Sequence, residues 1–346
     1  MDRNIFTLKT LTKIYEQIKP VHSSMWDKAI GKEVAEKTRK FEVHTKNAGR
    51  LRAALVGNRE KGIFIAKSAF AATTYEPPMI KLFTINEAEE MFEQKFGKTE
   101  YASPESAAQE ELARELKELR DIAARTKLWM LMTLLTTGVC PIGEKADMGI
   151  KYDADFTQEV LTSTDTFKNP DFDIVEYLKK KKEKIYKETG KTIDTIVIAS
   201  DVVPYFMKNK AVIADQQTIN SNLIQLSQKV ENLSDGMQTI AFLPKLNLTV
   251  YSYVDWAKTP DETEEQPLLP DGTIVGFKAK SFEVHYGALV LREKAGQKAK
   301  LFVQKEVIRT WYPDDSEDDE LQYHSAPLIM PEDAKSYFCS KVLGEE

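Results

Sequence analysis

Cysteine, histidine and long hydrophobic runs are all scarce in this sequence of 346 residues. Its two cysteines, Cys140 and Cys339, are too few for a disulfide framework, so we expect reduced thiols in a cytoplasmic setting. No hydrophobic run approaches the length of a membrane-spanning helix, and the N-terminus lacks the hydrophobic core of a secretion signal. The sequence therefore favours a protein that is neither inserted in a membrane nor secreted.

An excess of positive charge is also absent. The 48 Lys and Arg residues are outnumbered by 54 Asp and Glu residues, which gives a net charge of −6. A protein that binds DNA without regard to sequence needs a basic face, so this balance argues against that class. The chain is 42% hydrophobic and 29% charged, an ordinary soluble composition, and its length suggests two or three domains or subdomains.

The common enzyme motifs are missing. Gly57 and Gly62 have the spacing of the glycines in a phosphate-binding loop, but Ile63 and Phe64 stand where Lys and Ser or Thr must hold the phosphates and Mg²⁺. There is no G-x-G-x-x-G fingerprint and no G-x-S-x-G elbow. The histidines lack metal-ligand spacing, and we interpret each as a surface or hydrogen-bonded residue: His22, His44, His285 and His324. We therefore predict no catalytic residue, no cofactor and no metal site.

Two runs of like charge have both a functional and an ordinary interpretation. The acidic run from Asp314 to Glu320 has the oxygen ligands that Ca²⁺ prefers, but it lacks the glycine and the alternate spacing of an EF-hand loop. The four lysines from Lys179 to Lys182 allow phosphate binding. In both places we favour a solvated surface, a loop for the first and a helix face for the second.

The longest predicted element is a helix over residues 104–137. Ser103 is a good N-cap, Pro104 fits the first helical position, and Gly138 with Pro141 ends the helix. Its apolar residues recur every three or four positions and form one stripe: Leu112, Leu116, Leu119, Ala123, Thr126, Met130 and Leu134. At 1.5 Å per residue this helix is roughly 50 Å long, the width of a whole domain.

The two halves of this helix differ in composition. Glu110 to Arg125 alternates acidic and basic residues around the stripe, so we expect that half to be solvent-exposed and linked by pairs four residues apart. Leu128 to Leu135 is apolar nearly all round, so we expect it to be buried on several sides.

The segments before the helix have too few apolar residues to fold alone. Residues 1–40 contain two short helical patterns, of which the second runs from Met25 to Val34. Residues 41–85 alternate as short strands, one at Phe41 to Thr45 and another around Ile63 and Ile65. We predict a terminal arm followed by a two-stranded ribbon, and such a ribbon usually needs a partner surface.

After the helix, residues 170–290 have the pattern of a compact α/β unit. Asp173 and Glu176 form a capping box for a helix that Gly190 ends. Further helices are predicted at Val202 to Lys208 and Thr218 to Val230. Strands are predicted at Thr192–Ala199, Leu246–Val254, Thr273–Phe277, and, nearer the C-terminus, at Lys300–Trp311, His324–Met330 and Tyr337–Val342.

Three segments of the C-terminal third resemble a known family. Leu269 to Gly276, His285 to Leu289 and His324 to Met330 resemble three blocks of the lambda-type phage major capsid proteins (phage capsid protein E), in the order of that family and at similar separations. Ala146 to Gly149 resembles the segment that follows the long helix of that family. Tyr75 to Pro77, with the following Ile80, resembles the strand that returns toward this helix.

The resemblance implies an α+β fold of the Hong Kong 97 type. Residues 1–40 would be an N-terminal arm and 41–83 an extended β-hairpin loop. Residues 84–150 and 301–346 would form a peripheral domain whose spine helix is 104–137. Residues 151–300 would form an α/β axial domain, and Ser325 to Val342 would return as strands to the sheet beside the spine.

The resemblance also implies a function, the major capsid (head) protein of a tailed phage or prophage. The chain would assemble with itself into hexamers and pentamers of an icosahedral shell that encloses double-stranded DNA without reading its sequence. It would be assembled in the host cytoplasm and found in the virion, with no membrane contact. Scaffold, portal and decoration proteins are the other partners that the resemblance suggests.

The candidate contacts between subunits are charged residues. We hypothesise that the basic ribbon meets the acidic run of a neighbouring subunit. The residues concerned are Arg50, Arg52, Arg59 and Lys61 on the ribbon, with Asp314, Asp315, Asp318 and Asp319 in the acidic run. Two alternatives stay open: an encapsulin-like compartment shell, which shares the fold, and an α/β enzyme built on residues 170–290.

Overall fold

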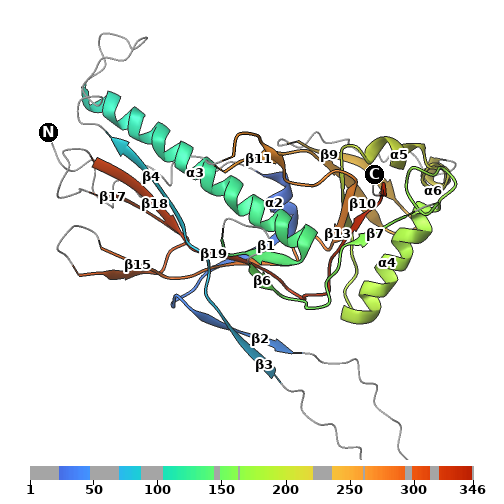
Figure 1. The fold of residues 1–346 in the computed structure, drawn as a ribbon, viewed down its shortest axis with the longest axis horizontal. Helices are drawn as coiled ribbons and strands as arrows, with labels where there is room; N and C mark the ends of the chain where they lie inside the picture. Colours follow the sequence, from blue (N-terminus) through green and yellow to red (C-terminus); the bar gives the residue numbers. More distant parts are fainter. Residues whose placement is uncertain are drawn as a thin grey trace, which may run out of the picture.

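The computed structural model describes residues 23–46, 70–86, 104–143, 149–162, 164–220, 236–259, 262–292, 298–311 and 319–344. Its fold is mixed α+β, as predicted (Figure 1). None of the helices within these ranges is both long and apolar enough to cross a membrane. The described helices are α2 (Ser24–Ala29), α3 (Pro104–Thr137), α4 (Ile174–Thr189), α5 (Val203–Lys208) and α6 (Lys210–Asn220).

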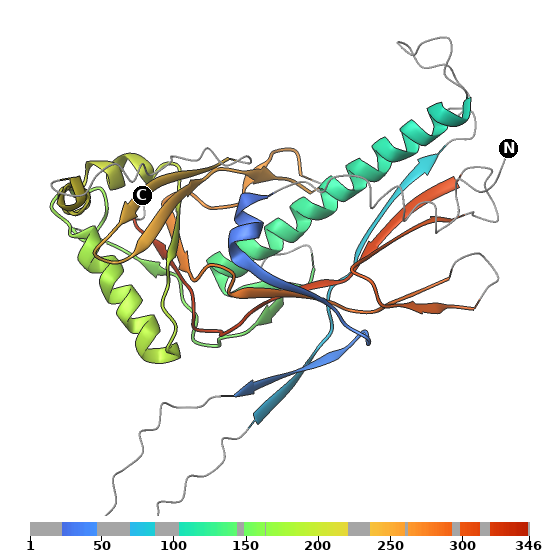
Figure 2. The same cartoon turned by 180° about the vertical axis from the view of Figure 1, so that it is seen from behind.

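Helix α3 has the predicted bounds and runs diagonally along the molecule (Figures 1 and 2). It ends at Gly138, whose φ of 76° is in the left-handed region and whose N–H donates to the Leu134 carbonyl at 2.9 Å. A Cβ at this position would lie 2.4 Å from Cδ1 of Phe156. Glycine is therefore required here both by the backbone angle and by the space.

A six-stranded sheet forms the larger part of the molecule, together with α4, α5 and α6. Its strands, in spatial order, are β7 (Glu159–Val160), β20 (Phe338–Lys341), β13 (Thr273–Phe277), β8 (Thr195–Ala199), β10 (Leu248–Tyr253) and β9 (Met237–Leu243). The two central strands, β13 and β8, are buried along their whole length. Helix α4 begins as predicted, because Asp173 Oδ1 accepts from the Glu176 N–H at 2.9 Å, and it ends at Gly190.

Strand β20 corrects one expectation. We predicted that the last strands return to the sheet beside the long helix, but β20 pairs with β13 in the six-stranded sheet, from Thr273 opposite Lys341 to Gly276 opposite Phe338. A Cβ on Gly276 would lie 2.2 Å from Cε1 of Phe338. Close approach of the Phe338 ring thus depends on the glycine, and the contact is between residues 62 positions apart in the sequence.

A smaller sheet lies against the first half of α3, at the other end of the molecule (Figure 1). Its strands are β17 (Glu306–Trp311), β18 (Asp319–Ser325) and β4 (Ile80–Asn86), in that order and antiparallel. Strand β4 is the return strand that the resemblance suggested after Tyr75–Pro77. The core between this sheet and α3 contains Leu112, Leu116, Leu119, Ala123, Ile308, Leu321 and Tyr323.

A third sheet, between these two, corrects a second expectation. Its strands are β1 (Ile30–Ala35), β14 (Phe282–Tyr286) and β19 (Pro327–Pro331). We predicted one helix from Met25 to Val34, but only α2 is helical and β1 runs parallel to β14. The hydrogen bonds of β14 stabilise an extended β1, and a Cβ on Gly31 would lie 2.3 Å from the Lys280 carbonyl oxygen.

The predicted ribbon is present where the structure describes it. Strands β2 (Phe41–Lys46) and β3 (Phe70–Tyr75) are antiparallel, and both figures show them projecting from the body. The strand expected around Ile63 and Ile65 lies outside the described residues. Of the helix predicted at Thr218 to Val230, residues 221–230 also lie outside them, and α6, which contains its first residues, begins earlier than predicted, at Lys210. The described residues also form three small strand pairs: β5 (Val139–Pro141) with β6 (Gly149–Lys151), β11 (Trp256–Ala257) with β12 (Gln266–Pro267), and β15 (Leu289–Leu291) with β16 (Lys300–Phe302).

Candidate assembly surfaces

The base of the β2–β3 ribbon is held to the body by backbone hydrogen bonds. The Glu36 N–H donates to the Tyr286 carbonyl at 2.7 Å, and the Ala288 N–H donates to the Thr38 carbonyl at 3.1 Å. Both bonds join the chain that enters the ribbon to β14 and the residues after it. The starting point of the ribbon is therefore fixed by the β1–β14–β19 sheet, which lies between the other two sheets.

Charged side chains add to this attachment. Glu76, just after β3, forms ion pairs of 2.9 Å with both Arg39 and Lys40, just before β2. The hydrogen bond from Lys40 lowers the pKa of Glu76. These side chains are exposed, so the pairs contribute little to overall stability, but they join the two chains that enter and leave the ribbon.

His285 joins the same region to β14. Its Nδ1 lies 2.8 Å from Glu36 Oε1, its Nε2 lies 3.3 Å from Glu283 Oε2, and its ring stacks on Phe41 with centroids 5.4 Å apart. This histidine is hydrogen-bonded, as predicted. Its contacts extend the attachment of the ribbon from the backbone to the side chains.

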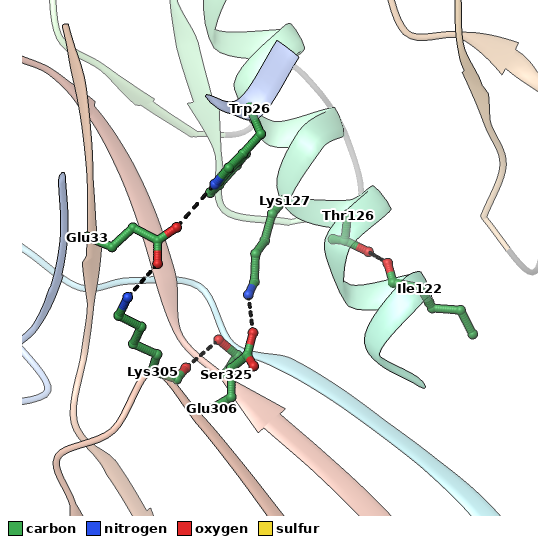
Figure 3. Close-up of polar contacts among 8 residues, drawn as sticks. All are labelled: Trp26, Glu33, Ile122, Thr126, Lys127, Lys305, Glu306 and Ser325. Atoms are coloured by element: carbon green, nitrogen blue, oxygen red, sulfur yellow. Dashed lines mark hydrogen bonds and ion pairs between the residues drawn. The ribbon is translucent and has the colours of Figure 1, made fainter. Parts of the chain in front are cut away.

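An ion pair joins α3 to the small sheet (Figure 3). Lys127, just before the apolar stretch of α3, pairs with Glu306 at the start of β17, and the two side chains are only 10% and 18% exposed. The Lys127 ammonium also lies 5.2 Å from the centre of the Tyr286 ring, on β14. The Lys127 side chain thus contacts both the small sheet and the β1–β14–β19 sheet.

The residue before Glu306 makes a second connection (Figure 3). Lys305 pairs with Glu33 of β1 at 2.7 Å, and Glu33 accepts a hydrogen bond of 3.1 Å from the indole N–H of Trp26. Ser325, at the end of β18, donates to the Lys305 carbonyl at 2.8 Å. Two neighbouring residues, Lys305 just before β17 and Glu306 at its start, therefore link the α2–β1 segment and α3 to the small sheet.

The charged residues predicted to contact a neighbouring subunit lie outside the described residues, with one exception. Arg50, Arg52, Arg59 and Lys61 fall in 47–69, and Asp314, Asp315 and Asp318 fall in 312–318. Asp319 is the first residue of β18, paired with Asn86 of β4 by its backbone. The proposed attraction between ribbon and acidic run therefore remains a prediction.

Exposed apolar side chains at the end with the small sheet were not predicted from the sequence. Phe83 and Ile85 on β4 are 61% and 58% exposed, and Leu301 and Val290 on the β15–β16 hairpin are 55% and 51% exposed. The signal was present in β4, where apolar residues occupy both alternating sets of positions although the strand lies at a sheet edge. Large exposed apolar patches mark interaction surfaces.

The α/β unit contains a pocket of about 810 Å³ between α4, α6 and the turn before β10. Its polar lining already takes part in the fold: Asp173 caps α4, and Lys182 donates to the Leu246 carbonyl. Lys182 and its neighbour Lys181 are half-buried, so the predicted solvated lysine face holds only for part of the run. No group of three or more potential metal ligands occurs among the residues that the structure describes.

Comparison with known families decides the class of protein. A model of the family described as phage major capsid protein E matches residues 7–342, nearly the whole chain. The chain belongs to this phage major capsid protein family. Its members are structural proteins of the phage capsid, so the α/β enzyme considered above is excluded. The chain is a major capsid protein of a tailed phage or prophage, and its place is the capsid of the virion.

Solved structures agree with this fold. A prophage capsid protein from E. coli CFT073, so described, is 13% identical and superposes with a TM-score of 0.65, covering 96% of this chain and 96% of that one. A phage-related protein from Bordetella bronchiseptica RB50 is 8% identical with a TM-score of 0.53, covering 98% of both chains. No curated protein matches this capsid protein in sequence.

Proposed function

We propose that this capsid protein builds an icosahedral shell as a subunit of the Hong Kong 97 type. In this proposal α3 is the spine helix, the small sheet with α3 is the peripheral domain, and the six-stranded sheet with α4 to α6 is the axial domain. The arm is residues 1–40, and the extended loop is residues 41–83, whose base is the β2–β3 ribbon. Strand β20 is assigned to the axial domain, because it pairs with β13.

The ribbon carries this proposal. A two-stranded ribbon is only marginally stable alone, yet β2 and β3 project from the body (Figures 1 and 2). The backbone bonds and ion pairs at its base fix where it leaves the body. A ribbon attached firmly at its base and projecting beyond its own core is well suited to lie on a neighbouring copy of the chain. Rings of copies with such unlike contacts close into capsomers.

The remaining partners follow from the same proposal. Hexamers and pentamers of this chain would form the shell, with scaffold, portal and decoration proteins joining it, and double-stranded DNA would be enclosed without sequence-specific contacts. The basic residues Arg50, Arg52, Arg59 and Lys61 would meet the acidic residues Asp314, Asp315, Asp318 and Asp319 of a neighbour. The net charge of −6 suits a wall that does not bind the packaged DNA tightly.

The test compares three proteins by size-exclusion chromatography and negative-stain imaging. The unchanged chain should form rings or closed shells. A variant with Asn-Gly in place of residues 47–69 should remain folded but fail to assemble, because Lys46 and Phe70 are paired in the ribbon and a two-residue turn can join them. Arg50→Glu with Arg52→Glu should also block shells.

Circular dichroism and thermal melting of the subunits provide the control for folding. A small monodisperse species from the unchanged chain, at concentrations where capsid proteins assemble, would contradict the proposed shell. Normal shells from the shortened variant would contradict the role of the ribbon. Normal shells from the charge-reversed variant alone would remove only the charge pairing.

A further inference from the structure

Among the residues that the structure describes, none covers one face of the small sheet over most of its length. Ile80 and Leu82 of β4 contact the core beneath α3. Because side chains alternate along a strand, Lys81, Phe83 and Ile85 point to the opposite face. Phe83 and Ile85 are the most exposed large apolar side chains that the structure describes, at 61% and 58%.

The register of the three strands shows how far this face is covered. Residues on it form three rows across β4, β18 and β17: first Lys81, His324 and Val307, then Phe83, Gln322 and Arg309, and last Ile85, Glu320 and Trp311. In the first row Val307 is buried in a cluster with Leu289 and Leu291 of β15. The β15–β16 hairpin thus covers the Val307 end of the first row, and beyond it the hairpin and the sheet diverge (Figures 1 and 2).

The polar side chains in the outer two rows are bonded to one another. Arg309 Nε donates to Gln322 Oε1 at 2.9 Å, and Gln322 Nε2 donates to Glu320 Oε2 at 2.6 Å. The Arg309 guanidinium also stacks on the Trp311 ring at 4.7 Å. Because these groups already have partners, covering this face removes apolar area from water and leaves few polar atoms unsatisfied. We call Phe83, Ile85 and Trp311 the sheet face.

The hairpin carries a second apolar surface that points away from the first. Leu289 and Leu291 are buried against the sheet, so Val290 between them points outward. Val290 is paired with Leu301 across the hairpin, and Val303 follows two residues later, with exposed fractions of 51%, 55% and 43%. We call Val290, Leu301 and Val303 the hairpin face.

We propose that the sheet face of one copy of this chain packs against the hairpin face of a second copy. This contact rests on the proposed shell function and adds a specific interface to it. The two faces cannot cover each other within one chain, because the hairpin presents its buried side to the sheet. In a contact between unlike surfaces, each copy uses its sheet face to bind one neighbour and its hairpin face to bind the next. Such a contact therefore continues from copy to copy around a ring. A symmetric contact between two sheet faces would leave every hairpin face exposed.

A charge-swap experiment tests this contact in the full-length chain. Phe83→Lys and Leu301→Glu each place an unpaired charge in the interface, and each should raise the concentration needed for assembly by about tenfold or more. Together they place opposite charges side by side and should recover most of the assembly. The matched control is Phe83→Lys with Leu301→Lys, which places like charges together and should assemble less well than either single variant.

Assembly is measured by light scattering against concentration and by negative-stain imaging, and the melting temperature of dissociated subunits checks folding. Both substituted positions, Phe83 and Leu301, are exposed in the subunit, so the melting temperature should shift little. Recovery by opposite charges but not by like charges supports the contact. Single variants that assemble normally, or double variants that behave alike, overturn it. Failure of the unchanged chain to form shells would instead count against the proposed function.

Discussion

The two halves of α3 lie in different cores. In the first half, Leu112, Leu116, Leu119 and Ala123 bury one stripe against the small sheet, while Ile122 on another side is 45% exposed. In the second half, Leu128 to Leu135 belongs to the large core that includes the six-stranded sheet. Trp129 is half-buried, and the other side chains of that octet are all buried.

This difference indicates that one helix connects a weakly buried unit to a strongly buried one. The first half buries one stripe against β17, β18 and β4, whereas in the second half every side chain from Leu128 to Leu135 except Trp129 is buried. Regions with few buried contacts open first. The small sheet can therefore adjust to neighbouring subunits while the helix keeps its position on the larger core.

Removing a buried leucine from each half should test this difference most strongly. Leu131 and Leu116 are both 0% exposed. Leu131→Ala should cost about 3–5 kcal/mol in the free energy of unfolding, and Leu116→Ala about 2–3 kcal/mol, because a small core near solvent collapses more easily around a cavity. Urea unfolding measures both values. In Leu116→Ala, hydrogen exchange should accelerate in β4 and β18 but not in β8 and β13, and uniform acceleration would contradict the division into two units.

The ion pair between the halves should have the next largest effect. Lys127→Met removes the ammonium group that pairs with the half-buried Glu306 carboxylate, at a cost of about 2–3 kcal/mol. Adding Glu306→Gln should recover at least half of that loss. Lys117→Met, at an exposed position of the same helix, should stay within about 0.5 kcal/mol. If the Lys117 and Lys127 variants had equal stability by urea unfolding, the junction would not depend on this pair.

The smallest effect should be on the pH dependence of stability, and it involves a histidine of the small sheet. His324 on β18 is buried near Arg309 and Lys81, and burial, reinforced by those charges, lowers its pKa from 6.5 to about 4. Between these values the unfolded chain binds more protons than the folded one, so stability falls as pH falls from 6.5 toward 4. In His324→Gln, the contribution of His324 to this loss of stability should disappear. The melting temperature should therefore fall less between pH 7 and pH 5 in this variant than in the unchanged chain. An unchanged difference between the two pH values would show that His324 does not contribute.

Elements with strong local signals agree with the sequence predictions. The cap at Asp173 and the glycines at 138 and 190 act within one helical turn, so the ends of α3 and α4 follow from neighbouring residues. The buried strand β13 has its predicted bounds, Thr273–Phe277. The burial of Leu128 to Leu135 on several sides could also be predicted locally, because apolar residues of this octet point in nearly every direction around the helix.

Pairing between distant strands accounts for the predictions that were wrong. The segment around Val34 has a helical pattern, but hydrogen bonds with β14 place it in a sheet. Strand β20 pairs with β13 in the six-stranded sheet, where Gly276 leaves room for the Phe338 ring. The exposed pair Phe83 and Ile85 could not be recognised as a surface until the register with β18 and β17 showed which face α3 covers.

The sequence by itself determined the family, the long helix and the caps, because these depend on residues close together in the chain or on blocks of residue types that match a family pattern. Only the tertiary structure decided which core each half of the helix enters and which apolar side chains stay uncovered. These depend on contacts such as that of Lys127 with Glu306, 179 residues apart. A local pattern cannot specify such contacts, because its apolar face fits any core of the right shape.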